Sequence, residues 1–182
     1  SQRPQRVIVT GGPGAGKSAL LAALARRGYP CAPDSARMII QERRRRGLSA
    51  RPDPAEFATG ILRNDIEQYR HAPTDVDVVF FDRAIPDALC MLSDLGRLSL
   101  AEAGQAVTEY RYCRQVFLAP SWQEIYTTDG ERDQDFADAV RVHRRASDWY
   151  EALGFELIEL PLVPIEERCA FVLEKLGMSP NP

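Results

Sequence analysis

Several kinds of sequence feature are missing from this 182-residue chain. No hydrophobic run approaches the roughly 20 apolar residues that a transmembrane helix needs. There is no internal repeat and no low-complexity tract, which excludes fibrous and disordered classes. Positive charge is not in excess either, because 23 Lys and Arg stand against 26 Asp and Glu, giving a formal net charge of -3. We therefore expect neither a membrane nor a nucleic acid as a partner.

Cysteine and histidine are also scarce. The chain has 4 cysteines, which are far apart and form no C-x-x-C pair, and 2 histidines, neither of which lies near a cysteine at metal-ligand spacing. This pattern predicts neither a zinc site nor a disulfide framework. Reduced thiols that serve as small apolar side chains are the simplest interpretation, and they favour a cytoplasmic location.

What the chain does contain is the usual balance of a globular domain, with 45% hydrophobic and 27% charged residues. Its length suits one domain over residues 1–182. Short β-branched or aromatic runs alternate with segments of helical periodicity, which predicts a parallel sheet covered by helices on both faces. We expect a three-layer α/β fold with five strands in the order 2-3-1-4-5. The expected strands are 7–10, 29–32, 76–81, 115–119 and 155–160.

One motif lies between the first expected strand and the helix that follows it. The stretch Gly11-Gly12-Pro13-Gly14-Ala15-Gly16-Lys17-Ser18 matches the P-loop pattern G-x-x-x-x-G-K-[ST] in full. Its backbone N–H groups and the helix N-terminus would surround the phosphates of ATP. Lys17 would reach the β- and γ-phosphates, and the hydroxyl of Ser18 would ligate Mg²⁺. The alternative is a glycine-rich turn without a ligand.

A second candidate for the magnesium site ends the third expected strand. Asp82 follows the apolar run at 78–81, where a carboxylate can hold the metal directly or through a water. The alternative is a turn or helix-capping carboxylate. Arg83, the next residue, lies where parallel strands open onto a ligand crevice, and it is a candidate to bind a substrate anion. A surface ion pair is the alternative role for Arg83.

Asp34 follows the second expected strand and should reach the same sheet edge as the P-loop. A carboxylate at this place can accept the proton of an attacking hydroxyl group, as phosphoryl transfer to an alcohol requires. Asp34 is equally placed to cap the helix that starts near Ser35. Arg37 is a weaker candidate for contact with substrate or phosphate.

Beyond the P-loop, three further parts of the chain carry a resemblance: the stretch Phe80-Phe81-Asp82-Arg83-Ala84-Ile85-Pro86-Asp87, the segment 122–126, and Pro161-Leu162-Val163. Through them the chain resembles a family of small predicted ATPases classed with AAA domains. The resemblance extends from Val7 to about Leu176. More distantly, the chain is similar to nicotinamide riboside kinase domains, deoxynucleoside kinases and thymidylate kinases. The similarity to these kinases implies an acidic residue and an arginine at the end of the third strand, which Asp82 and Arg83 match. It also implies a base after the second strand, which Asp34 matches.

The same resemblance implies a lid after the fourth strand, here around 121–135, with arginines that close over the transferred phosphate. Arg132 is the best single candidate, and Arg141, Arg144 and Arg145 are alternatives. Arg132 can equally be an exposed charge near a helix start. The chain has no room for the helical domain of a large AAA motor. A guanine-specific N/T-K-x-D element is missing, which favours ATP over GTP.

These observations predict a Mg-ATP-dependent phosphotransferase that acts on a small metabolite with a hydroxyl group. Its ligands would be a nucleoside triphosphate, magnesium and a small-molecule acceptor. The alternative is a regulatory NTPase that hydrolyses ATP and signals to a protein partner through its lid. Acceptor identity and oligomeric state have no sequence signal.

Overall fold

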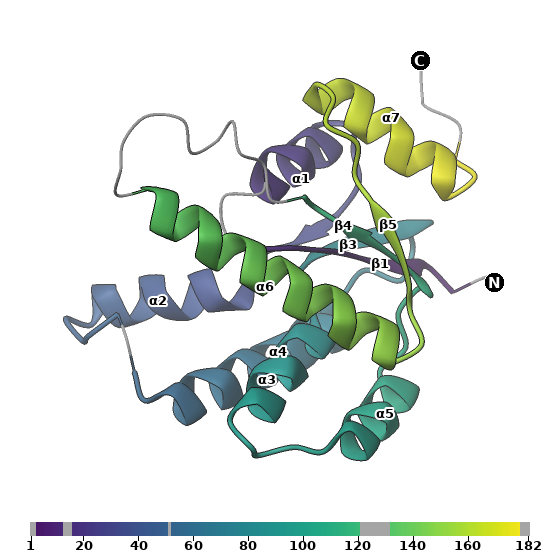
Figure 1. Ribbon diagram of the computed structural model, residues 1–182. Helices are drawn as coiled ribbons and strands as arrows, with labels where there is room; N and C mark the ends of the chain where they lie inside the picture. The colour runs from purple at the N-terminus through teal and green to yellow at the C-terminus, as the bar shows by residue number, and fades with distance from the viewer. Residues whose placement is uncertain (1–2, 13–15, 51, 121–131, 179–182) are drawn as a thin grey trace.

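The computed structural model describes residues 3–12, 16–50, 52–120 and 132–178. Within them, five parallel strands form one sheet in the order β2-β3-β1-β4-β5, which confirms the predicted fold class (Figure 1). The strands are β1 (Gln5–Thr10), β2 (Cys31–Ala32), β3 (Val78–Asp82), β4 (Gln115–Leu118) and β5 (Glu156–Glu159).

Helices cover both faces of this sheet, with α1 and α7 on one face and α3, α4, α5 and α6 on the other (Figure 1). No helix in the described ranges is long and apolar enough to cross a membrane. The helices are α1 (Lys17–Arg26), α2 (Ser35–Arg45), α3 (Pro54–His71), α4 (Ile85–Asp94), α5 (Leu100–Glu109), α6 (Arg132–Ala152) and α7 (Ile165–Lys175).

The central strand β1 shows why both faces need helices. Val7 and Val9 pack in the cluster under α1 and α7, whereas Ile8 packs in the cluster on the opposite face, and all three are fully buried. This alternation follows from the two-residue period of a strand. The chain therefore builds two cores, one on each side of the same sheet.

The register of β1 and β3 positions the site. Val9 of β1 lies beside Asp82 of β3, and β1 ends one residue later at Thr10. Because parallel strands end at the same sheet edge, the P-loop and the Asp82-Arg83 pair emerge next to each other.

Local signals set most helix starts. Asp53 caps α3 through Ala55 N and Glu56 N, with Pro54 as the first helical residue. Ser99 and Glu102 form a capping box at the start of α5. Asp34 caps α2 through Ala36 N in the same way, and Ser35 is the one buried residue of this helix.

Candidate functional site

The P-loop begins with a glycine that the fold requires. Gly11 has φ of 140°, and a Cβ atom at this position would lie 2.8 Å from the backbone oxygen of Ala119. Gly16, with φ of 82°, is the N-cap of α1. Both positions therefore favour glycine for conformational reasons. Pro13, Gly14 and Ala15 of the predicted phosphate-binding stretch lie outside the described residues.

Lys17 opens α1 and is 7% exposed. Its Nζ atom donates a hydrogen bond to the backbone oxygen of Gly12 at 3.3 Å. Burial lowers the pKa of this amine to about 8, helped by the nearby positive charge of Arg83, while Asp82 and Asp34 oppose the shift. The site thus holds a desolvated ammonium group that an incoming phosphate would stabilise.

Asp82 ends β3 and is also 7% exposed. Its Oδ1 atom is buried and has no hydrogen-bond partner among the described residues. Burial raises the pKa of the Asp82 carboxyl, and the charge of Lys17 acts in the opposite direction. A buried carboxylate oxygen with spare acceptor capacity is a suitable ligand for a hard cation.

Magnesium fits this donor set. It usually takes one or two protein oxygens and completes its coordination with phosphates and waters. Ser18 is exposed on the first turn of α1, and its Oγ accepts a hydrogen bond from Nη2 of Arg37 at 3.2 Å. The described residues contain no group of three or more His, Cys, Asp or Glu side chains that could hold a metal without the nucleotide. Asp82 and Ser18 each supply an oxygen atom of the kind that magnesium binds.

Arg83 connects the P-loop to the loop after β2. Its φ is 57°, a left-handed conformation that is uncommon for a side chain of this size. In this conformation its backbone N–H donates to Val9 at 2.9 Å and its Nε atom donates to the backbone oxygen of Gly11 at 3.2 Å. Its Nη1 atom lies 3.6 Å from Oδ2 of Asp34. Backbone strain of this kind is typical of functional sites.

The geometry of Asp34 is compatible with both roles that its sequence context suggests. One carboxylate oxygen accepts from Ala36 N at 3.0 Å and caps α2, and the other faces Arg83. The cap fixes the side chain at the sheet edge, where its second oxygen points toward the P-loop side of the site. Capping and a catalytic role are therefore geometrically compatible.

A polar cluster behind Asp34 has no motif in the sequence. Asp65 of α3 is 5% exposed, and its carboxylate accepts a short hydrogen bond from the hydroxyl of Ser35. Asn64 and Gln68 donate to the same hydroxyl at 2.9 and 3.0 Å. Burial raises the pKa of Asp65 to about 7. The cluster ties α3 to the first residue of α2, directly beside Asp34.

Asp87 is another polar residue that the sequence alone does not reveal. Its carboxylate accepts from Thr10 Oγ1 at 2.7 Å, from Tyr150 OH at 2.6 Å and from Ala84 N at 3.0 Å. These donors belong to the end of β1, to α6 and to the start of α4. One side chain thus joins the entrance of the P-loop to two helices.

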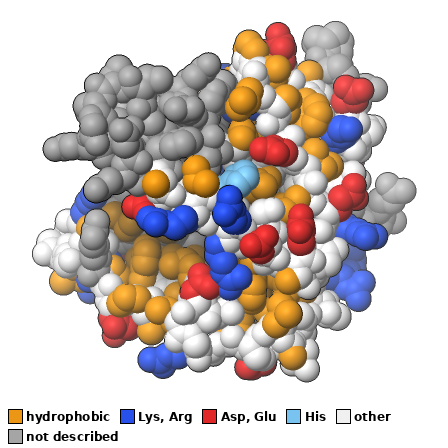
Figure 2. Space-filling model, viewed as in Figure 1, with side chains coloured by type: hydrophobic (Ala, Val, Ile, Leu, Met, Phe, Trp, Pro, Cys, Tyr) orange, Lys and Arg blue, Asp and Glu red, His pale blue; other side chains and the backbone are white. Residues whose placement is uncertain are grey.

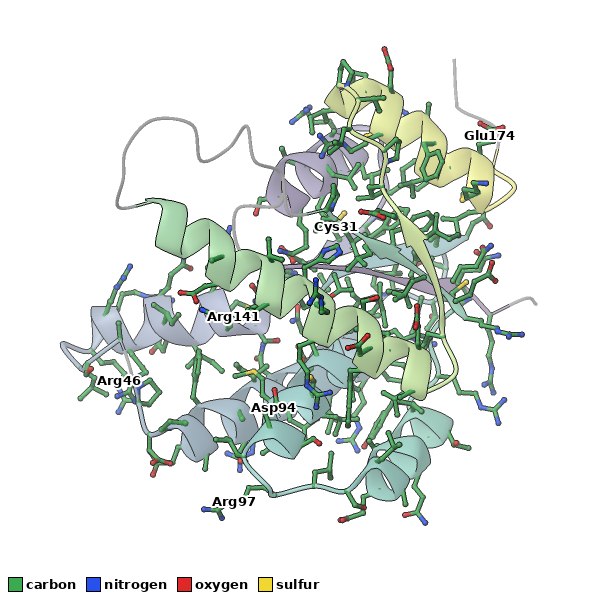
Figure 3. All side chains as sticks on the ribbon, in the orientation of Figure 1. Cys31, Arg46, Asp94, Arg97, Arg141 and Glu174 are labelled. Atoms are coloured by element: carbon green, nitrogen blue, oxygen red, sulfur yellow. The ribbon has the colours of Figure 1, made fainter. Side chains whose placement is uncertain are left out.

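A cavity of about 400 Å³ opens from this site between α4 and α6. Its inner end is formed by Gly11 and Arg83, and its far end by Asp94 and Arg145, which form an ion pair at 2.8 Å. Figure 3 labels Asp94 on α4 and Arg141 on α6, and Figure 2 shows in the same view a hollow beside α6 with hydrophobic walls. The walls include Cys90, Met91, Val142 and Ala146.

The expected lid around 121–135 extends into the first residues of α6. Residues 121–131 and the side chain of Arg132 lie outside the described part, and the backbone of Arg132 starts α6. Arg141 pairs with Asp138 within α6, and Arg145 reaches across to Asp94 on α4. Both arginines also line the cavity.

The fold and this arrangement of residues define a protein with the P-loop NTPase fold. A family model described as an AAA domain matches residues 6–168, so the chain belongs to this AAA domain family. The family that the sequence resembles is thereby confirmed. A comparison with curated proteins gives no match.

Three solved structures illustrate what the chain is similar to in its fold. Deoxyadenosine kinase from M. mycoides with bound dATP matches with a TM-score of 0.58 at 12% identity, covering 95% of this chain and 99% of that one. Thymidylate kinase from Candida albicans gives 0.62 at 11%, covering 97% and 92%. NadR protein in complex with NR gives 0.64 at 14%, covering 98% of this chain and 53% of that chain. At such identities the likeness establishes the fold.

Proposed function

We propose that this protein is a Mg-ATP-dependent phosphotransferase that acts on a small hydroxyl-bearing metabolite. The position of Arg83 carries this proposal. Its side chain contacts Gly11 of the P-loop and Asp34, and it also lines the cavity between α4 and α6. One side chain therefore contacts the P-loop, the carboxylate that we propose as the base and the cavity that we propose for the acceptor.

In the proposed reaction, the P-loop and Lys17 hold the triphosphate, while Ser18 and Asp82 hold Mg²⁺. When bound, the magnesium would neutralise phosphate charge. The acceptor hydroxyl lies in the cavity, and its oxygen bonds to the γ-phosphorus. Its proton passes to Asp34 as the bond from phosphorus to the β,γ-bridging oxygen breaks and ADP leaves.

The arginines would stabilise the negative charge on the transferred group. Arg83 is fixed in place by its two contacts, and Arg37 lies beside Ser18. We propose Arg132 as the residue that closes over the phosphate. The size of the cavity favours a metabolite over a polymer, because about 400 Å³ lies in the lower range of small-molecule pockets.

The direct test is to incubate the protein with Mg-ATP and pooled metabolites and to follow phosphorylated products by mass spectrometry. We expect a product that depends on one metabolite class and is lost in Lys17→Met. ADP formation with water alone would favour the regulatory NTPase instead. No nucleotide binding by the wild-type protein would refute both functions.

Asp34→Asn tests the base, because asparagine keeps the helix cap but cannot take a proton. Transfer should fall by about 10²- to 10⁴-fold while Mg-ATP binding stays unchanged. Asp53→Asn is a matched control, since Asp53 caps α3 in the same way and is exposed. Normal transfer by Asp34→Asn would remove Asp34 from the mechanism.

The acceptor cavity has its own test. Met91→Trp places a larger side chain in the wall of the cavity, away from the P-loop. We expect a raised KM for the acceptor with an unchanged dissociation constant for Mg-ATP. An unchanged acceptor KM would contradict this location for the acceptor.

A further inference from the structure

Helix α2 begins at the proposed base, yet its only buried side chain is polar. Asp34 is its N-cap residue, and of residues 35–45 only Ser35 is buried, at 1% exposed. Met38 of the same helix is 38% exposed, and Figure 1 shows α2 at the side of the molecule. A serine hydroxyl is thus the buried anchor of the helix whose first turn holds the Asp34 carboxylate.

The contacts of this hydroxyl are complete. Ser35 donates to the carboxylate of Asp65, and it accepts from Asn64 Nδ2 at 2.9 Å and from Gln68 Nε2 at 3.0 Å. A hydroxyl group has one donor and two acceptor positions, so all three are used. The three partners belong to one side of α3, because a helix places residues four apart on the same face. We call these four side chains the polar cluster.

The polar cluster holds the chain on both sides of Asp34. Gln68 Nε2 also donates to the backbone oxygen of Pro33 at 2.9 Å, so the residues directly before and after Asp34 are tied to the same helix. Between them, one oxygen of Asp34 accepts from Ala36 N at 3.0 Å, and the other lies 3.6 Å from Nη1 of Arg83. The direction of the Asp34 carboxylate therefore depends on where α3 holds this backbone.

Attachment of α2 alone does not require a buried carboxylate. Asp65 is 5% exposed, and its removal from water costs free energy that an apolar pair at the same contact would avoid. Hydrophobic contact has no preferred direction, whereas a hydrogen bond weakens steeply as its angle departs from linear. A network of polar side chains is therefore suited to fix the orientation of a helix start.

We propose that the polar cluster, centred on the hydrogen bond between Ser35 and Asp65, is the positioning device of the base, holding the Asp34 carboxylate where it accepts the proton of the acceptor hydroxyl. The inference rests on the proposed function for the reaction that Asp34 serves. In that reaction the cluster acts through Asp34 alone and touches neither substrate. It extends the site to α3, which no P-loop motif includes.

Ser35→Ala removes the centre of the polar cluster, and the readout is transfer from γ-labelled Mg-ATP to the pooled metabolites. We expect kcat to fall by about 10- to 100-fold with an unchanged KM for Mg-ATP, since misplacement of a reacting group by about 1 Å can cost about 100-fold. Asp65→Asn keeps an acceptor for the hydroxyl and, as the conservative variant, should stay within about threefold of wild type. Ser99→Ala is the matched control, because it also removes a serine hydroxyl at a helix start, that of α5.

A role through Asp34 has a kinetic signature that general loss of structure lacks. In an Asp34→Asn background the base is already absent, so Ser35→Ala should lower kcat further by no more than about twofold. Losses that multiply in the double variant would overturn the proposal, because the cluster would then act on another part of the site. An unchanged kcat in Ser35→Ala would overturn it as well.

Amide hydrogen exchange measured by NMR tests the geometry in the free protein. The Ala36 amide donates to the Asp34 carboxylate, so its exchange reports whether that carboxylate is held. Exchange at Ala36 should be at least about tenfold faster in Ser35→Ala and within about threefold of wild type in Asp65→Asn and Ser99→Ala. Unchanged exchange in Ser35→Ala would mean that the cluster does not hold Asp34.

The two readouts separate this inference from the proposed function. Wild-type protein that transfers no phosphate refutes the proposed function, while exchange at Ala36 still decides whether the cluster holds Asp34. If Ser35→Ala does not fold, Gln68→Met replaces it, because it removes the contacts to Pro33 and Ser35 at a less buried position. A lower kcat with faster Ala36 exchange in that variant supports the proposal, and wild-type values of either overturn it.

Discussion

Among single residues, Lys17 should couple the proposed nucleotide binding to pH. Burial lowers its pKa to about 8, so the free site loses this proton as the pH rises through that value. A bound triphosphate favours the charged amine and raises its pKa again. Binding at pH 8 to 9 should therefore take up a proton, and affinity for Mg-ATP should fall as the pH rises from 7 to 9 by up to about tenfold.

Calorimetric titration at pH 8.5 in two buffers of different ionisation enthalpy measures that proton directly. Lys17→Met serves as the control, because any binding it retains should involve no proton uptake at this position. An affinity that stays constant from pH 7 to pH 9 would contradict a buried, titrating Lys17.

Asp65 should make the stability of the protein depend on pH. Burial raises its pKa from 3.8 to about 7 in the folded state, although the hydrogen bond from Ser35 opposes the shift. The folded state therefore holds more protons than the unfolded chain between these values. The resulting stability is fully present below about pH 3.8 and is lost as the pH rises through 7.

Asp65→Asn imitates the neutral carboxyl group, keeps an acceptor for Ser35 and never becomes charged. At pH 8 we expect it to raise the free energy of unfolding by about 1–2 kcal/mol relative to wild type, and the difference should shrink at pH 5. Urea unfolding at the two pH values measures this. The exposed Asp75→Asn is the control. A difference that is the same at both pH values would show that Asp65 does not titrate in this range.

These residues also show where sequence reasoning stops. Lys17, Ser18 and Asp82 carry a motif or end a strand, so their neighbourhood can be predicted from local pattern and the rule that parallel strands end together. Asp65 sits on a helix whose apolar spacing is ordinary. Its importance comes from Ser35, which lies 30 residues away in the sequence and which only the folded chain brings close.

Among elements, Asp87 is the junction of β1, α4 and α6. It accepts hydrogen bonds from Thr10, Tyr150 and Ala84, one from each element or its start. Tyr150 is fully buried, and burial raises the pKa of its hydroxyl well above the usual value, so it is a neutral donor. Loss of the Asp87 carboxylate leaves buried donors without an acceptor.

We therefore expect Asp87→Ala to lower the free energy of unfolding by about 3 kcal/mol and Tyr150→Phe by about 1–2 kcal/mol. The two losses should not add in the double variant, since both remove the same contact. Urea unfolding of the four proteins gives the comparison. Fully additive losses would mean that the contact between these two side chains contributes nothing to stability.

The ends of elements are less predictable than their existence. The expected strand at 29–32 is reduced to Cys31–Ala32, because Pro30 has no N–H group and only its backbone oxygen takes part, accepting from Phe80 N at 2.9 Å. Helix α4 starts at Ile85, directly before Pro86, and Ala84 N donates to Asp87 in its first turn. Local backbone chemistry, which the hydrophobic pattern does not show, decides both boundaries.

For the whole molecule, the charge distribution matters more than the total. The net charge of -3 is small. Within it, Lys17, Arg83 and Arg168 are collected around the P-loop, and Asp34, Asp82 and Asp87 lie close enough to Lys17 to affect its pKa. Positive side chains and carboxylates are therefore gathered at one site. This pattern suits the Mg-triphosphate that we propose as the ligand, whereas the net charge of -3 gives no general attraction to polyanions.

The prediction of one domain over 1–182 can be tested through cooperativity. The N-terminal strand β1 is the middle of the sheet, and α7 near the C-terminus packs on α1. Because these contacts join the two ends of the described part of the chain, the protein should unfold in one transition whose calorimetric and van't Hoff enthalpies agree. Mg-ATP binds only the folded P-loop and should shift that whole transition upward, by about 2.7 kcal/mol at 100 times its dissociation constant. Differential scanning calorimetry measures both effects, with Lys17→Met as the control that should show no shift. Two transitions, of which only one moves with Mg-ATP, would show that a separately folding unit exists outside the nucleotide site.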